Sequence, residues 1–387
     1  IAEGEDKGKS VLLHLADTSV GRQLIVDDKG LRDKITDEGL NAVIAEGEDK
    51  GNSALLLLAN TYEGLQLLID DADLLGKITV EGLNAVLVEG QYKGYSVLFS
   101  LACSDEGEQL LVSNKVLRNK ITDVGLNAVI AKEEGKSALF CLAGTYEGQR
   151  LLIHDEVLRG KITAEGLNAT LAEGLGKGKS ALSLLAAKSE GRQLLIDDTN
   201  LRAKITNVGL NAVIAEGEQK DQSALSFFAN RSEGLQLLID DKVLRAKITD
   251  EGLNAVIAHG PHNGSSVLFN LAVSAERLQL LIEDEVLRSK ITIEGLNAVI
   301  PVREGEGWSV LLLLAIDPKA RQLLIDDEVL RSKITVEGMN AVIAQGKYKG
   351  TSALFFLACT PEGRQLLIDD PVLRAKITAE GLNATID

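Results

Sequence analysis

Three copies of the tripeptide Gly-Lys-Ser, at residues 8–10, 135–137 and 178–180, could each form the end of a nucleotide-binding P-loop. A P-loop places four residues between its first glycine and Gly-Lys-Ser, and it joins a strand to a helix. Only three residues lie between Gly4 and Gly8, and no period-2 apolar pattern predicts a strand. The glycine is therefore expected to permit a turn and the serine to begin a helix, and the sequence predicts no cofactor. The lysine position is occupied in other copies by Asn52, Tyr95, Gln222, Ser265, Trp308 and Thr351.

A second chemical pattern is a row of basic residues that runs from Arg32 and Lys34 to Arg374 and Lys376, interrupted only by Leu75. One basic pair per repeat could follow the phosphates of a nucleic acid. The same residues also have a structural interpretation. An aspartate four residues before an arginine forms a favourable i,i+4 pair, and a lysine near a helix C-terminus offsets the dipole. We favour the structural interpretation. The pairs are Asp28 with Arg32, Asp241 with Arg245, and Asp327 with Arg331.

The three cysteines, Cys103, Cys141 and Cys359, are odd in number and widely separated. Their spacing predicts neither a disulfide framework nor a metal site. We therefore expect an intracellular, reducing compartment, which is the cytoplasm of the producing cell or the cytosol of a cell into which the protein is delivered. The start at Ile1 shows no charged region followed by an apolar stretch, and no 18-residue apolar run predicts a membrane span.

Histidine and paired aspartate offer no better evidence for catalysis. His259 and His262 are too few ligands for zinc, and no histidine has a repeated serine or cysteine partner that could serve as a nucleophile. In the pairs such as Asp70-Asp71, one carboxylate is the expected cap of a helix, and no calcium-loop spacing follows. The sequence predicts a chain that is not an enzyme and holds no metal.

The net charge of −16 argues against a general affinity for nucleic acids and anionic membranes, because both attract positive charge. A basic partner is more compatible with this composition. The hydrophobic content of 45% is sufficient for a core.

The whole chain consists of repeats, because Gly-Leu-Asn recurs every 43 residues, with one interval of 41 and one variant, Gly338-Met339-Asn340. The sequence therefore predicts a single array over 1–387, with excision from a longer protein as one interpretation. The nine copies are 1–43, 44–86, 87–129, 130–170, 171–213, 214–256, 257–299, 300–342 and 343–385.

Four capping positions divide each copy into short helices. Position 10 is always serine, position 36 always threonine, and position 28 aspartate except at Asn114. Position 18 is threonine, serine or aspartate in seven copies, and we expect the cap to shift by one residue at Lys188 and Arg231, each of which is followed by serine. Proline directly follows an expected cap at Pro318, Pro361 and Pro371.

The caps predict three or four helices per repeat, at positions 11–17, 19–27, 29–35, and from 37 into the next repeat. Helices this short are unstable alone and must pack against their equivalents in neighbouring repeats. We expect an all-α solenoid of nine repeats that forms a right-handed superhelix. Asparagine at position 41 and glutamine at position 23, which Arg150 replaces once, are expected to satisfy backbone groups from repeat to repeat.

The segment Gly51-Asn-Ser-Ala-Leu-Leu-Leu-Leu-Ala-Asn-Thr-Tyr-Glu-Gly-Leu-Gln-Leu-Leu-Ile69 resembles part of an ankyrin repeat. In that family a Gly-x-Thr-Pro-Leu-His-x-Ala-Ala helix is followed by a turn and a leucine-rich helix. Here Ser-Ala replaces Thr-Pro, the histidine is missing, and the repeat length is similar to that of armadillo repeats. The resemblance implies that the loop before each first helix and the outer face of that helix line a groove that binds proteins.

The copies differ most at positions 5–9, 13, 14 and 17, which lie in that loop and on that face. Residues that hold the repeats together must recur from copy to copy, whereas residues on a surface that contacts an irregular partner need not. We expect a non-catalytic scaffold that binds a protein or an extended peptide of basic character, with a modular nucleic-acid or phosphate-binding solenoid as the alternative. The candidate partner-binding residues are Tyr92, Tyr95, Pro261, His262, Trp308, Lys347, Tyr348, His14, Asp17, Asn230, Asn270 and Phe356.

Overall fold

The computed structural model describes residues 9–45, 50–87, 94–130, 135–259, 263–299, 307–344 and 348–384. These ranges contain 36 helices, four in each of the nine repeats, and only two isolated β-bridges. The prediction of an all-α solenoid is confirmed. No helix in the described ranges is both long and apolar enough to span a bilayer.

The first helix of each repeat begins where the sequence predicts. The side chain of the serine at position 10 accepts a hydrogen bond from the backbone N–H three residues later, as from Leu56 to Ser53 at 3.1 Å. This cap is present in all nine copies. The first helices are α1 (Val11–Asp17), α5 (Ala54–Ala59), α9 (Val97–Ala102), α13 (Ala138–Gly144), α17 (Ala181–Ala187), α21 (Ala224–Ala229), α25 (Val267–Ala272), α29 (Val310–Ile316) and α33 (Ala353–Ala358).

The second helix has nine residues in every repeat, and its cap departs from the prediction in two copies. Lys188 and Arg231 occupy the cap position itself and make no capping bond. The cap does not shift, because Ser189 is already helical and its hydroxyl donates to Glu190. The second helices are α2 (Ser19–Asp27), α6 (Tyr62–Asp70), α10 (Asp105–Ser113), α14 (Tyr146–His154), α18 (Ser189–Asp197), α22 (Ser232–Asp240), α26 (Ala275–Glu283), α30 (Pro318–Asp326) and α34 (Pro361–Asp369).

The third helix is a single turn that begins after aspartate, or after Asn114 in the third repeat. The cap side chain accepts from the third backbone N–H of the helix, as from Leu74 to Asp71 at 2.9 Å. The expected proline at the first helical position is confirmed at Pro371. The third helices are α3 (Lys29–Arg32), α7 (Ala72–Gly76), α11 (Lys115–Asn119), α15 (Glu156–Gly160), α19 (Thr199–Ala203), α23 (Lys242–Ala246), α27 (Glu285–Ser289), α31 (Glu328–Ser332) and α35 (Pro371–Arg374).

The fourth helix ends sooner than predicted. It stops at the asparagine of position 41. Beyond it, in the first junction, Ile44 N–H donates to the carbonyl of Asn52 and Gly51 N–H donates to that of Ile44. These two backbone bonds replace the helical continuation that the apolar spacing suggests. The fourth helices are α4 (Asp37–Asn41), α8 (Val80–Asn84), α12 (Asp123–Asn127), α16 (Ala164–Asn168), α20 (Asn207–Asn211), α24 (Asp250–Asn254), α28 (Ile293–Asn297), α32 (Val336–Asn340) and α36 (Ala379–Asn383).

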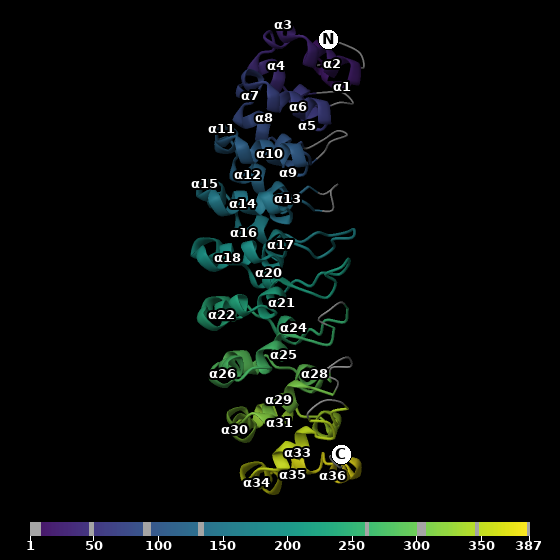
Figure 1. The fold of residues 1–387 in the computed structure, drawn as a ribbon, viewed down its shortest axis with the longest axis vertical. Helices are drawn as coiled ribbons and strands as arrows, with labels where there is room; N and C mark the ends of the chain where they lie inside the picture. Colours follow the sequence, from purple (N-terminus) through teal and green to yellow (C-terminus); the bar gives the residue numbers. More distant parts are fainter. Residues whose placement is uncertain are drawn as a thin grey trace. The chain divides into compact units, whose positions relative to one another are not determined.

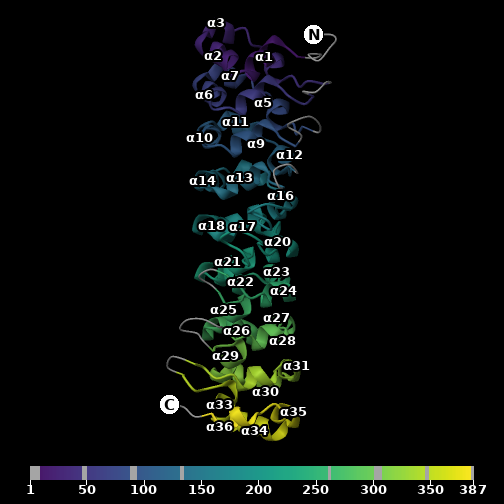
Figure 2. The same ribbon diagram turned by 90° about the vertical axis from the view of Figure 1, so that its right-hand side faces the viewer.

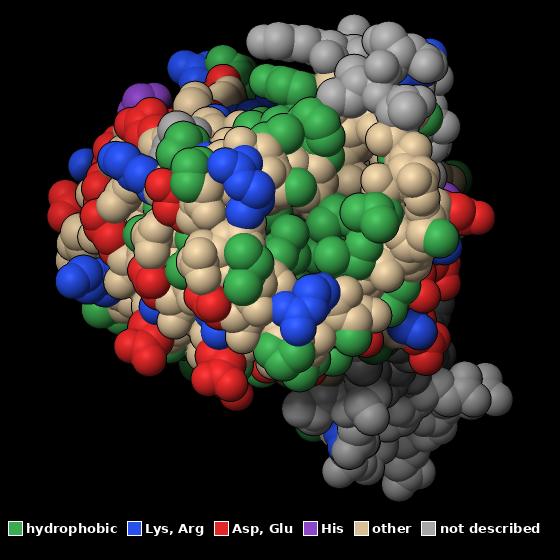
Figure 3. Space-filling model, turned by 90° about the horizontal axis from the view of Figure 1, so that it is seen from below, with side chains coloured by type: hydrophobic (Ala, Val, Ile, Leu, Met, Phe, Trp, Pro, Cys, Tyr) green, Lys and Arg blue, Asp and Glu red, His purple; other side chains and the backbone are tan. Residues whose placement is uncertain are grey.

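Contacts divide the chain into two compact units, Ile1–Ile205 and Thr206–Asp387. Within each unit, equivalent helices of successive repeats lie against one another, as do α5, α9 and α13 in the first unit and α25, α29 and α33 in the second (Figures 1 and 2). The leucine of Gly-Leu-Asn lies in the core between repeats: Leu296 is 0% exposed, whereas Leu382 in the last repeat is 70% exposed. Figure 3 shows apolar side chains on this uncovered face of the last repeat.

The Gly-Leu-Asn motif joins adjacent repeats through the asparagine amide. Nδ2 of Asn41 donates to the carbonyl of Lys77 at 2.8 Å, and Oδ1 accepts from the N–H of Thr79 at 3.0 Å. The amide occupies the space beside Gly82, where an added Cβ would lie 1.9 Å from Asn41 Oδ1. The predicted asparagine ladder is therefore confirmed, and the motif's glycine leaves room for the preceding repeat's asparagine.

The predicted glutamine ladder is wrong. Gln23 Nε2 donates to the carboxylate of Asp27 at 2.8 Å, which lies on the same helix rather than in another repeat. The same i,i+4 bond joins Gln66 to Asp70 at 3.0 Å. Position 23 lies on the exposed face of the second helix, where an intrahelical carboxylate is the nearest acceptor.

Candidate functional site

The geometry of Gly-Lys-Ser accounts for the motif without a ligand. The glycine at position 8 has a positive φ in every described copy where it occurs, with 97° at Gly135 and 87° at Gly178, and Asp221 takes the same conformation at 68°. The following serine caps a helix of only seven residues, as Ser137 caps α13. The predicted roles of the glycine in the turn and of the serine in the cap are both confirmed.

The basic ladder joins repeats, although not through the pairs predicted. Arg32 Nε donates to Asp71 of the next repeat at 2.7 Å, and its Nη1 donates to the carbonyl of Ile25 at 2.9 Å. The predicted i,i+4 pair with Asp28 is wrong, because that carboxylate caps its own helix by accepting from Leu31 N–H. The same correction applies to Asp241 with Arg245 and to Asp327 with Arg331. The observed pairs are Arg32–Asp71, Arg118–Asp155, Arg159–Asp198, Arg245–Asp284, Arg288–Asp327 and Arg331–Asp370.

The one gap in the arginine row is matched by a change in its partner. Leu75 replaces arginine in the second repeat, and Asn114 replaces aspartate in the third. The arginine of one repeat pairs with the aspartate of the next. Leu75 and Asn114 therefore occupy the two positions of one such pair, at the junction between the second and third repeats. Leu75 is buried, and a carboxylate beside it would have no guanidinium to neutralise it. This paired change is visible in the sequence once the partner is known.

The lysine at position 34 also acts between repeats. Lys120 Nζ donates to the carbonyl of Gly76 at 3.2 Å and also to that of Ile78, both in the preceding repeat. A cation near the last carbonyls of a helix offsets its dipole, as the sequence predicts, but the helix belongs to the neighbouring repeat. The arginines and lysines of the ladder thus already have protein acceptors in the described junctions.

The partnered aspartates have pKa values below the ordinary range. Burial alone would raise the pKa of Asp71, but the backbone N–H of Leu74 and the guanidinium of Arg32 stabilise the ionised carboxylate more strongly. The pKa values of Asp155, Asp198 and Asp284 are lowered by the same balance of causes.

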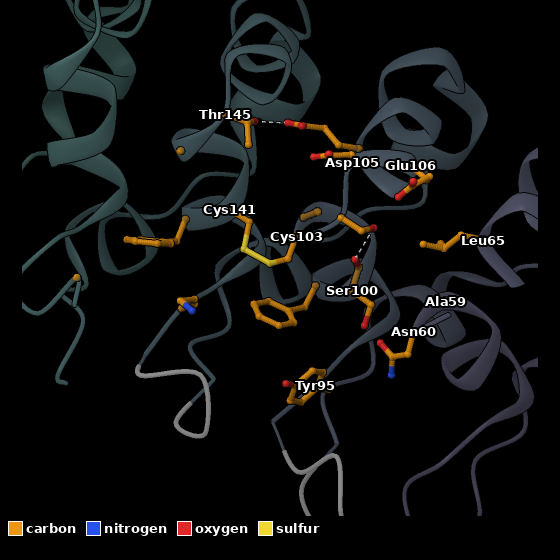
Figure 4. Close-up of a pocket in the computed structure, with 18 of the residues that line it drawn as sticks. Ala59, Asn60, Leu65, Tyr95, Ser100, Cys103, Asp105, Glu106, Cys141 and Thr145 are labelled. Carbon is orange, nitrogen blue, oxygen red and sulfur yellow. Dashed lines mark hydrogen bonds between the residues drawn. A yellow bond between two sulfur atoms is a disulfide. The ribbon is translucent and has the colours of Figure 1, made fainter. Parts of the chain in front are cut away.

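A groove of about 1040 Å³ crosses the second to fifth repeats within the first unit (Figure 4). Its floor is formed by the outer faces of α9, α13 and α17, with Phe99, Phe140 and Leu184. One wall consists of turns that carry Tyr95, Leu175, Lys136 and Lys179. The opposite wall is formed by the starts of second helices, with Tyr62, Asp105, Glu106, Glu108 and Thr145.

The positions that line this groove are largely those where the copies differ. Phe99 and Phe140 occupy position 13, Tyr95 and Lys179 position 9, and Leu175 position 5. The wall formed by the second helices was not anticipated. Its position 22 is Arg, Leu, Glu or Gln in different copies, and this variation was a visible signal.

Glu108 is the buried acid of the groove, at 6% exposure. Its carboxylate accepts from the Thr145 hydroxyl and from the backbone N–H of Gly148 in the next repeat. Burial raises the pKa of Glu108 above its usual range, although these two hydrogen bonds oppose the shift. The acid therefore reinforces the start of α14, while Asp105 and Glu106 add two further carboxylates to the groove lining (Figure 4).

Cys103 and Cys141 form a disulfide in the groove, with their Cα atoms 5.3 Å apart (Figure 4). The expectation that the cysteines form no disulfide is wrong, because stacking brings position 17 of one repeat beside position 14 of the next. The expectation of a reducing compartment rested on unpaired cysteines and loses that support. Cys359 is free and exposed.

Other junctions use the same two positions for non-covalent contacts. Asn270 at position 14 donates from Nδ2 to Oδ1 of Asn230 at position 17 of the preceding repeat, at 2.5 Å. Gly144 lies beside Leu184, whose Cδ1 would be 3.7 Å from an added Cβ. Part of the variation at positions 14 and 17 therefore has a structural cause, because the two residues must fit each other.

Three predicted binding residues lie together in the second unit. Trp308, Tyr348 and Phe356 form a chain of edge-to-face aromatic contacts with centroid separations of 5.8 Å for both Trp308–Tyr348 and Tyr348–Phe356. Phe355 extends the chain at 5.5 Å from Phe356. Two loops and one helix face thus contribute to one aromatic cluster.

The remaining candidates are dispersed. His14 and Asp17 lie exposed on α1 and do not line the groove. Asn230 and Asn270 form their own pair in the second unit. Tyr95 lines the groove and contacts Phe99 edge to face at 5.3 Å. The candidates that lie outside the described residues are Tyr92, Pro261, His262 and Lys347.

In comparisons with known proteins, no family model, curated protein or solved structure matches the chain. The likeness to ankyrin and armadillo repeats therefore remains one of sequence pattern.

Proposed function

We propose that the chain is a non-catalytic scaffold that holds an extended segment of another protein in the groove of its first unit. The observation that carries this proposal is the coincidence of a groove of about 1040 Å³ with the positions at which the repeats differ. An extended chain rises about 3.3 Å per residue and stacked helices are spaced by about 10 Å, so about three residues of partner span each repeat.

The chemistry of the lining defines the segment. The apolar floor, with Phe99, Phe140 and Leu184, favours aliphatic or aromatic side chains. Asp105 and Glu106 favour arginine or lysine on the side of the segment that faces the second-helix wall. The net charge of −16 strengthens the attraction of a basic partner. Lys136 and Lys179 on the turn wall would repel arginine and lysine, so the basic side of the bound segment faces the acidic wall.

The aromatic cluster of the second unit supports a second contact surface for the same class of partner. Aromatic side chains provide a large contact area and attract the cations of lysine and arginine. Trp308 and Tyr348 lie at turns, as the groove residue Tyr95 does in the first unit. We assign this cluster the role of an anchor for basic and apolar side chains.

Selection from a displayed library of random 12-residue peptides tests the proposal. The intact chain is the target, and a variant with Leu175→Glu and Phe140→Glu is used for counter-selection, because both changes place charge in the groove. The expected products combine apolar residues with arginine or lysine. A selection that yields only acidic peptides, or peptides that bind both proteins equally, would contradict the groove assignment.

A further inference from the structure

The disulfide of the groove is accessible to a reactant. Cys103 is exposed at the C-terminal end of α9, and Cys141 on α13 is partly exposed. Both cysteines line the groove, with the acidic wall on one side and Tyr95 on the other (Figure 4). A structural disulfide is normally protected by burial, whereas an exposed one is open to attack by a thiolate.

The fold does not need this covalent bond in order to stack repeats. At the equivalent positions of other junctions, Asn270 donates a hydrogen bond to Asn230, and Leu184 lies beside Gly144. The asparagine amide and the arginine pair also join the third repeat to the fourth, through Asn127 and Arg118. Reduction would therefore leave the two repeats packed.

We propose that Cys103–Cys141 is a thiol–disulfide exchange site whose co-substrate is a dithiol reductant, and that its oxidation state controls the groove. A thiolate of the reductant attacks Sγ of Cys103, and the Cys141 thiolate leaves and takes a proton. The second thiolate of the reductant then attacks the reductant's own sulfur in the mixed disulfide and releases Cys103, which is also protonated. The protein gains two electrons and two protons, and the dithiol becomes a disulfide.

Charged groups of both signs surround the disulfide. Lys136 and Lys179 line the same groove, and positive charge favours the thiolate forms that attack and leave, whereas Asp105 and Glu106 of the acidic wall oppose them. The bond links α9 to α13, two of the three first helices that form the groove floor. The oxidised form holds this part of the floor in one arrangement, so a bound segment loses less freedom than it would on the reduced form.

Counting reactive thiols tests the exchange step independently of any partner. The folded chain is treated with iodoacetamide, with and without prior dithiothreitol, and the added mass is measured. One alkylated cysteine is expected before reduction, from Cys359, and three afterwards. With Cys359→Ser the numbers become zero and two. Three alkylated residues without reductant, or only one after it, would overturn the proposal.

The claim that the oxidation state of the disulfide changes peptide affinity rests on the proposed function. A peptide obtained by the display selection is used to measure this affinity. Reduction is expected to weaken peptide binding about threefold or more, because the floor is less preorganised. The matched control is Cys103→Asn with Cys141→Asn, which copies the Asn230–Asn270 pair and should bind the peptide equally with and without reductant.

The outcomes separate the two claims. Equal peptide affinity in the oxidised and reduced wild-type chain would overturn control of the groove while leaving the exchange site intact. If the control variant also lost affinity on reduction, the effect would lie outside this disulfide and the coupling would again be refuted. Failure of every selected peptide to bind either form would refute the proposed function and leave the thiol count standing.

Discussion

At the level of single residues, the junctions between repeats are specified by pairs whose members lie about 40 residues apart. Arg118 Nε lies 2.7 Å from Asp155, and both side chains are mostly buried. Leu75 and Asn114 show that the pair changes as a unit, since an arginine without its acid would leave a buried charge unpaired. Each ion pair thus stabilises the junction between two repeats only when both the arginine and the aspartate are present.

Restoring the missing pair tests this interpretation. Leu75→Arg and Asn114→Asp are each expected to destabilise the chain, because each introduces a charge without its partner. Together they should be more stable than the sum of the single changes by about 1 kcal/mol. Urea denaturation of the four proteins measures this coupling, and Arg118→Leu with Asp155→Asn is the reverse control. Strictly additive effects would refute the pairing.

The same aspartates predict a dependence of stability on pH. The folded-state pKa values of Asp71, Asp155, Asp198, Asp284 and Asp370 are lowered, so folding favours their ionised forms. Their contribution is fully present above the unfolded value of about 3.9 and is lost as the pH falls through the folded values. Urea midpoints between pH 5 and pH 2 should fall, and less steeply for Asp155→Asn. A wild-type midpoint independent of pH would contradict this.

At the level of elements, the fourth helix is fitted to its neighbour by a glycine. A Cβ on Gly125 would lie 2.1 Å from Asn84 Oδ1 of the preceding repeat. The motif around Gly39 in the first repeat differs only in having Glu38 where the third repeat has Val124, but the nearest atom to the Cβ position of Gly39 is Thr36 Oγ1 at 3.2 Å. The chain therefore contains its own comparison between a glycine required by packing and one that is not.

Alanine at these two positions should give different results. Gly125→Ala is expected to destabilise the chain by about 1–3 kcal/mol, because the asparagine must move and its bridging bonds are strained. Gly39→Ala should change stability by less than about 1 kcal/mol. Adding Asn84→Ala to Gly125→Ala should remove the clash but not restore the lost hydrogen bonds. Equal effects of the two glycine changes would refute the packing argument.

The helix starts could be predicted because a cap is local: Ser53 and Asp71 each bond to an N–H three residues away. The early end of the fourth helix could not, because Ile44 pairs with the carbonyl of Asn52 across a turn. The partners of Arg32 and Cys103 depend on how one repeat stacks on the next, which spacing within one repeat does not reveal. Turn residues such as Tyr95 could be chosen because their variation is visible in the sequence. The wall formed by Asp105 and Glu106 was missed because its residues belong to the first turn of a predicted helix, although positions 19 and 22 of that helix also vary between copies.

At the level of the whole molecule, each unit is a stack in which repeated positions hold the repeats together and variable positions line open surfaces. The first unit has the groove, and the second has the aromatic cluster. Since part of the variation at positions 14 and 17 serves contact between repeats, the turns and the second-helix wall are the surfaces left to select a partner. The proposed binding is therefore expected to depend on Glu106 and Leu175 as well as on the apolar floor.

The most direct test of the central claim is the affinity of a selected peptide for two matched charge reversals, measured by fluorescence anisotropy. Glu106→Lys changes the acidic wall of the groove, and Glu276→Lys makes the same change at the equivalent position of α26, outside the groove. Binding through the groove predicts at least about a tenfold loss for Glu106→Lys and little change for Glu276→Lys. Equal affinities for the two variants, or a greater loss for Glu276→Lys, would contradict it.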